Sequence, residues 1–125
     1  MASVRYIVDD VDAAVAFYTE HLGFEVQMRP APTFAMLRRD DLRLLVSGAE
    51  GPGGGAQEVG GRKPEPGGWN RFQLEVSGLD EIMERLRAAG VPFRGEPVTG
   101  VAACQALVED PAGNPVELFE MLESE

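Results

Sequence analysis

The sequence has very little cysteine and histidine. Among 125 residues there is one cysteine, Cys104, and one histidine, His21. A single cysteine excludes a disulfide within the chain and suggests a reducing compartment. One histidine per chain argues against an iron centre that needs two histidines and a carboxylate. His21 itself stands at the end of a predicted helix, a position where the helix dipole favours histidine.

Basic residues and long apolar runs are also scarce. Eleven Lys and Arg stand against 21 Asp and Glu, which gives a formal net charge of −10. Binding a phosphate backbone needs clustered cations, so we expect no nucleic-acid partner, while cationic ligands are mildly favoured. No apolar run approaches the ~18 residues that a membrane span requires. The N-terminus lacks the basic and apolar regions of a signal peptide, so we expect a cytoplasmic protein with no membrane partner.

One order of elements occurs twice in the chain. An apolar strand, an amphipathic helix led by aspartate and a glycine stop span Val4 to Gly23 and again Phe72 to Gly90. The corresponding positions match in character: Val8 with Val76, Val11 with Leu79, Asp12 with Asp80, Ala14 with Ile82, Val15 with Met83 and Tyr18 with Leu86. A duplicated module usually builds its working site between the copies.

Each copy predicts the order βαβββ. In the first copy Asp10 or Asp12 can cap the helix and Gly23 can end it. The expected strands are Val4–Val8, Phe24–Met28, Thr33–Leu37 and Leu42–Val46, around a helix over residues 11–22. The second copy predicts strands Phe72–Val76, Val91–Phe93, Ala103–Val108 and Pro115–Glu120, with a helix over Leu79–Ala89.

These patterns predict one α+β domain over residues 1–125. Module one covers residues 1–48, a Gly-rich linker covers 49–68, and module two covers 69–125. Between Gly51 and Gly68 there are eight glycines and three prolines, which cannot pack inside a helix or strand. Either this segment is a flexible linker, or it is a mobile flap over a site.

Three segments carry a resemblance to a known family: VRYIVDDVDAAVAFYTEHLGFEV, GGWNRFQLEVSGLDEIMERLRAAGVPF and LVEDPAGNPVELFE. They resemble the vicinal oxygen chelate superfamily, which includes glyoxalase I, extradiol dioxygenases, fosfomycin-resistance enzymes and bleomycin-resistance binding proteins. The resemblance implies two βαβββ modules whose mixed sheets curl into a cleft. It also implies dimers that share or swap modules, so we expect a homodimer. One fold hosts many chemistries, and function needs separate evidence.

Enzymes of this superfamily typically hold a divalent metal with His and Glu side chains from four strands. The resemblance carries these four positions to Ser3, Leu44, Arg71 and Glu117, with the strand position of Leu44 uncertain by one residue. Only Glu117 has a ligand-type side chain, whereas catalytic sites usually need about three protein ligands. We therefore expect neither a metal nor another cofactor.

Strand alternation indicates what lines the expected cleft. If Phe72 and Leu74 pack on the helices, Arg71 and Gln73 face the other way. Trp69, where the linker enters a strand, either anchors the linker on the core or stacks on a planar ligand at the cleft rim. The expected ligand-binding residues are Ser3, Arg5, Leu44, Trp69, Arg71, Gln73, Glu117 and Phe119.

The pair formed by Arg71 and Glu117 has two interpretations. It is either a structural ion pair in which the arginine replaces the missing cation, or it grips a polar ligand. Three functions follow. The first is a metal-free protein that binds a small organic molecule, similar to the bleomycin-resistance proteins. The second is an isomerase, cyclase or lyase that transfers protons with Glu117 as its catalytic base. The third is a non-catalytic relative with a filled cleft, and a glyoxalase- or dioxygenase-type metalloenzyme is less favoured than these.

Overall fold

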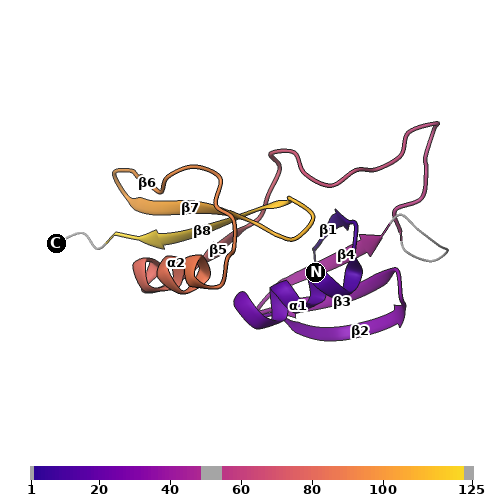
Figure 1. Ribbon diagram of the computed structural model, residues 1–125, viewed down its shortest axis with the longest axis horizontal. Helices are drawn as coiled ribbons and strands as arrows, with labels where there is room; N and C mark the ends of the chain where they lie inside the picture. The colour runs from indigo at the N-terminus through magenta and orange to yellow at the C-terminus, as the bar shows by residue number, and fades with distance from the viewer. Residues whose placement is uncertain (1, 49–54, 123–125) are drawn as a thin grey trace. The chain divides into compact units, whose positions relative to one another are not determined.

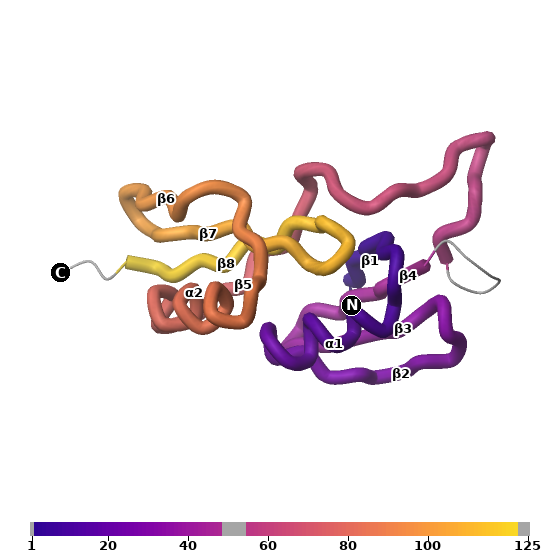
Figure 2. Tube along the Cα trace, in the orientation of Figure 1, coloured from indigo at the N-terminus to yellow at the C-terminus, as the bar shows by residue number. Residues whose placement is uncertain are grey.

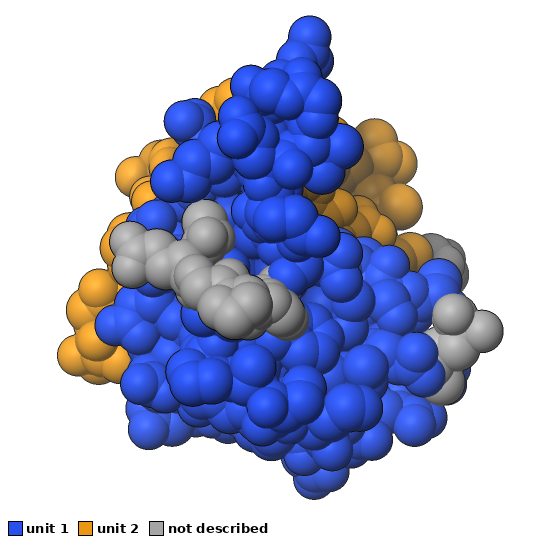
Figure 3. All heavy atoms as spheres, turned by 90° about the vertical axis from the view of Figure 1, so that its right-hand side faces the viewer, with its two compact units in different colours: residues 1–67, 111–114 blue, residues 68–110, 115–125 orange. Residues whose placement is uncertain are grey.

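The duplicated order of elements is present in the structure. The computed structural model describes residues 2–48 and 55–122, and the chain divides into two compact units. The first unit contains residues 1–67 and 111–114, and the second contains 68–110 and 115–125 (Figure 3). Each unit has one helix and one four-stranded mixed sheet, which confirms the predicted α+β class. Within the described residues no helix combines the length and the apolar character needed to cross a membrane.

The first unit follows the predicted order closely (Figure 1). Its elements are β1 (Ser3–Val8), α1 (Val11–His21), β2 (Glu25–Ala31), β3 (Phe34–Arg39) and β4 (Leu42–Gly48). The sheet order is β1-β4-β3-β2, with β1 and β4 parallel and the other neighbours antiparallel. The helix begins as expected from an aspartate, because Asp10 Oδ1 accepts a hydrogen bond of 3.1 Å from the Ala13 amide. It ends before Gly23, which has a φ of +72°.

The second unit repeats the order, with one strand in a different place. Its elements are β5 (Gln73–Glu75), α2 (Leu79–Ala88), β6 (Val98–Thr99), β7 (Ala103–Glu109) and β8 (Pro115–Met121), in the sheet order β5-β8-β7-β6. The predicted strand Val91–Phe93 is wrong, because only Phe93 forms a bridge there, to Val108. Pro92 has no N–H to donate to a ladder. The edge strand next to β7 comes later in the chain, at β6.

The start of α2 differs from the expected pattern. Its N-cap residue is Gly78, which has no side chain to accept the first helical N–H groups. Glu120, at the end of β8, performs this role from another element. Its two carboxylate oxygens accept hydrogen bonds from the Gly78 and Leu79 amides at 2.7 and 3.1 Å. These bonds hold the pKa of Glu120 below its ordinary value of 4.5, because they favour the charged carboxylate.

Each sheet has one face buried under a helix and one face without a helix. In β4, Leu44 is fully buried, and a Cβ added at Gly48 would come within 3.2 Å of Val11 Cγ2 on α1. Side chains alternate along a strand, so Arg43 and Leu45 lie on the opposite face. In β8, likewise, Leu118 is fully buried and its neighbours in the strand point to the other side. We call these the helix-free faces of the first and second sheets.

The described part of the Gly-rich linker is tied to the first unit. Residues 55–67 follow a path with no helix or named strand (Figure 2), as the glycines and prolines predict, although Ala56 is buried. At its end, Gly67 donates a hydrogen bond to the side-chain oxygen of Asn114, whose amide nitrogen donates to the Ile7 carbonyl of β1. The rest of the predicted linker, residues 49–54, lies outside the described residues.

The assignment of faces in β4 can be tested by truncating two neighbouring leucines. Leu44→Ala removes a fully buried side chain and is expected to lower the free energy of unfolding by about 2–5 kcal/mol. Leu45→Ala, on the helix-free face and half-buried, is expected to cost less than about 1.5 kcal/mol. Urea denaturation measures both. A larger loss for Leu45→Ala would reverse the assignment of the two faces.

The Glu120 cap predicts a pH-dependent contribution to stability. A carboxyl with a pKa lowered by folding stabilises the protein above its unfolded pKa, and this contribution is lost as the pH falls through the folded pKa. Glu120→Gln is therefore expected to lower the urea midpoint at pH 7, and the gap should close as the pH falls below 4.5. Glu84→Gln, on the exposed side of α2, is the matched control. A gap that is independent of pH would contradict the proposed cap.

Candidate functional site

A buried carboxylate is the centre of the helix-free face of the second sheet. Glu117 in β8 is only 4% exposed. Its Oε1 accepts a hydrogen bond of 2.9 Å from Arg71 Nε, and its Oε2 accepts one of 2.5 Å from Gln73 Nε2. Both oxygens therefore have a partner, and the arginine balances the charge. Arg71 and Glu117 thus form the ion pair that one of their two interpretations expects.

The backbone register brings these side chains together. β5 and β8 are parallel, and Gln73 stands directly beside Glu117. The Glu117 amide donates a hydrogen bond of 3.1 Å to the carbonyl of Phe72, the residue before β5. The pairing with β8 therefore extends from the first residue of β5 back towards Arg71. Phe72 and Leu74 are buried, as alternation predicts, so the polar residues between them lie on the opposite face. Phe119, two residues after Glu117, is half-buried on this same face.

Arg71 has hydrogen-bonding capacity left over. Its Nε donates to Glu117, and its Nη1 donates to the Trp69 carbonyl at 3.1 Å. Within the described residues Nη2 has no partner. A guanidinium has five N–H donors in a fixed plane, so the pair with Glu117 orients the arginine and leaves donors for another group.

An arginine that the sequence analysis did not single out holds Trp69. The Arg94 guanidinium carbon lies 4.6 Å from the centre of the Trp69 ring. Arg94 also donates to the Gly68 carbonyl and to Glu109, which forms an ion pair with it at 2.6 Å. The indole is nevertheless 67% exposed. No local signal identifies Arg94, because it follows α2 in a loop and meets Trp69 only in the folded unit.

The other predicted residues fall in the first unit. Ser3 and Arg5 lie on the helix-free face of the first sheet, because they pair in register with Arg43 and Leu45. The prediction that Leu44 lines a site is wrong in its choice of face, since Leu44 is fully buried on the side of α1. Leu45, the next residue, lies on the helix-free face where Leu44 was expected. A shift of one residue along a strand moves a side chain to the other face.

Neighbours on β7 complete the second helix-free face. Gln105 stands opposite Phe119, and Leu107 stands opposite Glu117. At the end of the sheet, Val98 and Met121 are exposed. The face is therefore mixed, with a polar centre at Glu117 and apolar side chains towards the ends of β6 and β8.

These residues do not fit the divalent metal that the resemblance implies. Of the four implied positions, Ser3, Leu44 and Arg71 offer no carboxylate or imidazole, and replacing Leu44 by Leu45 changes nothing. Both oxygens of Glu117 are engaged, one of them by a cation. In the part of the chain that the structure describes, no group of three or more His, Cys, Asp or Glu side chains could hold a metal ion.

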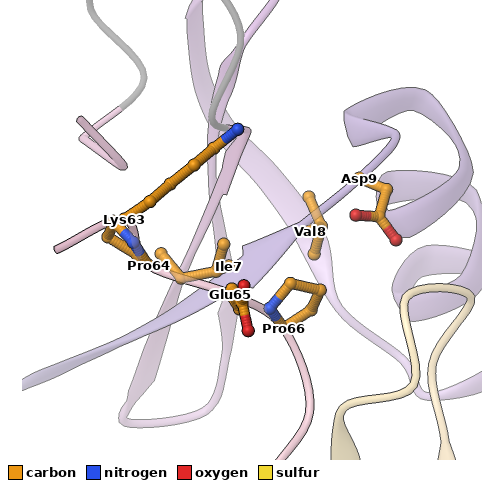
Figure 4. Close-up of a pocket in the computed structure, with 7 residues that line it drawn as sticks. All are labelled: Ile7, Val8, Asp9, Lys63, Pro64, Glu65 and Pro66. Carbon is orange, nitrogen blue, oxygen red and sulfur yellow. The ribbon is translucent and has the colours of Figure 1, made fainter. Parts of the chain in front are cut away.

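A pocket also lies in the first unit. It has a volume of about 400 Å³ and is lined by Ile7, Val8 and Asp9 at the end of β1 and by residues 63–66 of the linker (Figure 4). Lys63 and Glu65 supply opposite charges, and two prolines stiffen the segment. None of the predicted site residues lines it. The convergent hydrogen bonds at Glu117 are the stronger indication of a binding site, since recognition needs polar groups placed with precision.

Comparisons with known proteins agree with this architecture. The model of the Glyoxalase/Bleomycin resistance protein/Dioxygenase superfamily matches residues 1–118. A probable chloroplastic lactoylglutathione lyase from Arabidopsis thaliana is 28% identical over 129 residues, covering 96% of this chain but 35% of its own length. The chain thus spans about a third of that relative.

Solved structures share the fold. The crystal structure of a glyoxalase/bleomycin resistance protein/dioxygenase from Nocardioides is 28% identical, with a TM-score of 0.72, and the match covers 99% of this chain and 84% of that one. TnmS3, an antibiotic binding protein from Streptomyces sp. CB03234, is 24% identical, with a TM-score of 0.70 and coverage of 96% and 93%.

The Arg71–Glu117 pair predicts a measurable coupling. Arg71→Met leaves a buried carboxylate without its cation and is expected to cost about 1–3 kcal/mol of unfolding free energy. Glu117→Leu in the same chain should recover part of this loss, because no charge is then left buried. Urea denaturation of the two single variants and the double variant gives the coupling, and Arg62→Met, at an exposed arginine, is the control. Strictly additive losses would show that the pair contributes no coupling.

Proposed function

Because the chain belongs to the glyoxalase/bleomycin resistance protein/dioxygenase superfamily, we propose that it binds a small organic molecule without a metal, on the helix-free face of the second sheet. The observation that carries this proposal is the pattern of hydrogen bonds made by Arg71 and Glu117. The carboxylate has partners for both oxygens, whereas the arginine keeps N–H donors for a further acceptor. Glu117 thus serves to hold Arg71 in place.

The chemistry of the face suggests which ligand fits. Arg71 suits a carbonyl, carboxylate or other oxygen acceptor, which its planar donors can meet in pairs. Trp69 offers an exposed indole, and its backbone carbonyl accepts a hydrogen bond from Arg71. Leu107, opposite Glu117 on β7, and Phe119, two residues further along β8, add apolar surface on the same face. We therefore favour a planar, aromatic ligand with at least one oxygen acceptor.

The similarity to TnmS3 is consistent with ligand binding as a use of this fold. The resemblance to the bleomycin-resistance proteins favours the same class, in which a protein sequesters a molecule without transforming it. The relative from Arabidopsis thaliana carries the name of a lyase, and the chain matches about a third of it. Its activity therefore lends limited support to catalysis here.

A second candidate is an isomerase, cyclase or lyase that uses Glu117 as its base. The observation that favours it is the placement of a buried carboxylate on a face with free donors nearby. Against it, a base needs a free oxygen lone pair aimed at the substrate, and both Glu117 oxygens already accept hydrogen bonds. Binding is therefore the better-supported function.

The single tryptophan of the chain provides a direct test. Thermal-shift screening of aromatic natural products with oxygen substituents selects ligands, because binding stabilises the folded state by mass action. Titration of each ligand should then change the fluorescence of Trp69. Arg71→Ala is expected to weaken binding about tenfold or more, since it removes a charged hydrogen-bond donor. Glu117→Gln should weaken binding less, because the amide still accepts a hydrogen bond from Arg71.

Controls separate this result from general effects. Arg62→Ala and Glu84→Gln change the same charges at exposed positions and should bind as the parent does. Equal affinity of Arg71→Ala and the parent would reject the proposed site. Stoichiometric metal in protein purified without chelator would reject the metal-free function. Turnover of a bound ligand that Glu117→Gln abolishes would establish the enzymatic alternative.

A further inference from the structure

Arg94 lies on the helix-free face of the second sheet. On β7, Leu107 and Glu109 stand on either side of the fully buried Val108, so both side chains point to the helix-free side. Glu109 forms an ion pair of 2.6 Å with Arg94, which holds the guanidinium on this side. Phe93, the preceding residue, forms a bridge with Val108 and a cation–π contact with an arginine of α2.

Leu107 separates Arg94 from Glu117 on this face. It stands directly opposite Glu117 of β8, and on its other side its carbonyl accepts a hydrogen bond of 2.8 Å from the Arg94 amide. Neighbouring strands are about 4.8 Å apart, so the backbones of Arg94 and Glu117 lie about 10 Å apart across the half-buried Leu107. An aromatic ligand with two fused rings spans such a distance. Arg94 and the arginine that pairs with Glu117 therefore stand at the two ends of one ligand-sized surface.

The guanidinium of Arg94 covers one face of the Trp69 indole. Its carbon lies 4.6 Å from the centre of the ring, and its nitrogens donate to Glu109 and to the Gly68 carbonyl, both at 2.6 Å. The Arg94 side chain is only 16% exposed, whereas Trp69 is 67% exposed. The cation is thus fixed against the indole, and much of the remaining indole surface is open to a ligand.

A cation on one face of an indole changes what the other face can bind. The ring attracts cations through the negative charge of its π system, and Arg94 already occupies that interaction. A second cation stacked on the ring would be repelled by the guanidinium, whereas a neutral or anionic ring would not. The guanidinium itself, and not Glu109, is the group in contact with the indole.

The hydrogen-bond donors of Arg71 favour the same sign of ligand charge. A hydrogen bond from a guanidinium to an anionic oxygen is about twice as strong as one between neutral groups. The net charge of −10 favours cations, but this long-range attraction is screened beyond about 8 Å at physiological ionic strength. At contact distance the two arginines therefore outweigh the charge of the chain as a whole.

We infer that Arg94 determines the charge preference of the proposed site, and that its ligand is a planar aromatic anion such as an aromatic carboxylate or phenolate. This inference rests on the proposed function, because it needs a ligand on the helix-free face of the second sheet. Trp69 stacks on the aromatic ring, and Arg71 donates to the anionic oxygen. Arg94 acts through the indole as a positioning residue.

Three naphthalene probes of equal shape and different charge test the preference. Calorimetric titration compares 2-naphthoate, the neutral 2-naphthamide and the cation 2-naphthylmethylammonium at physiological ionic strength. We expect 2-naphthoate to bind most tightly and the cation about tenfold more weakly or worse. A cation that binds as well as 2-naphthoate would overturn the inference.

A double variant separates the local charge from the net charge. Arg94→Met combined with Glu109→Gln removes the cation from the indole, leaves no unpaired carboxylate and keeps the net charge of the chain. The preference for 2-naphthoate over the cation should then shrink about tenfold, and Arg94→Lys alone should retain part of it. Arg62→Met, at an exposed arginine, changes the net charge and should keep the preference of the parent. An unchanged preference in the double variant would reject the role of Arg94.

The outcomes distinguish this inference from the proposed function. If Arg71→Ala weakens all three probes but the parent binds them equally, the proposed site stands and the charge preference is rejected. If none of the probes binds to the parent, the proposed function fails as well. Without any ligand, the near-ultraviolet circular dichroism of the single tryptophan should decrease in the double variant, because the indole is no longer held by Arg94. An unchanged spectrum would show that Arg94 does not position the ring.

Discussion

One constraint underlies the candidate site at Glu117: a single helix covers only one face of a four-stranded sheet. In each unit the buried residues of the strands alternate with residues on a second face, and α1 or α2 supplies the only helical cover within the described parts of that unit. Leu44 and Leu118 are fully buried on the helix side. Their neighbours Leu45 and Glu117 must lie on the other side, where no helix replaces the solvent. The duplicated module therefore leaves each sheet with one face that the helix of its own unit does not cover.

The two helix-free faces differ in their chemistry. On the second sheet a buried carboxylate is fully hydrogen bonded within the protein, and the arginine that balances it retains donors. Removing a carboxylate from water costs several kcal/mol unless a cation and hydrogen bonds compensate, which explains why Glu117, Arg71 and Gln73 occur together. On the helix-free face of the first sheet Arg5, Arg38 and Arg43 make no ion pair with a described residue, although Glu25 stands in register opposite Arg38.

This charge arrangement also accounts for the absence of a metal-type donor set at Glu117. A divalent cation and an arginine side chain both neutralise a carboxylate, and they compete for the same oxygens. With Arg71 at one of the implied ligand positions, the protein supplies the positive charge itself. Unlike a metal ion, an arginine offers hydrogen bonds in fixed directions, because its N–H groups lie in one plane and can meet two acceptors at once. This favours recognition of an oxygen-bearing ligand over Lewis-acid chemistry.

The sequence by itself determined the order of elements in the first unit, a cap of α1 by Asp10 or Asp12, and two interpretations of Arg71 and Glu117, of which one was an ion pair. The structure then selected Asp10 and the ion pair. These features rest on local rules: periodicity, side-chain capping and the alternation of residues near a strand whose position is well marked. The choice between Leu44 and Leu45 needed the tertiary structure, because both residues are leucine and the apolar run from Leu42 to Val46 does not mark its phase. The cap of α2 by Glu120 and the stacking of Arg94 on Trp69 also join residues far apart in the chain. Such contacts depend on strand register and loop path, and these are decided only when the whole unit packs.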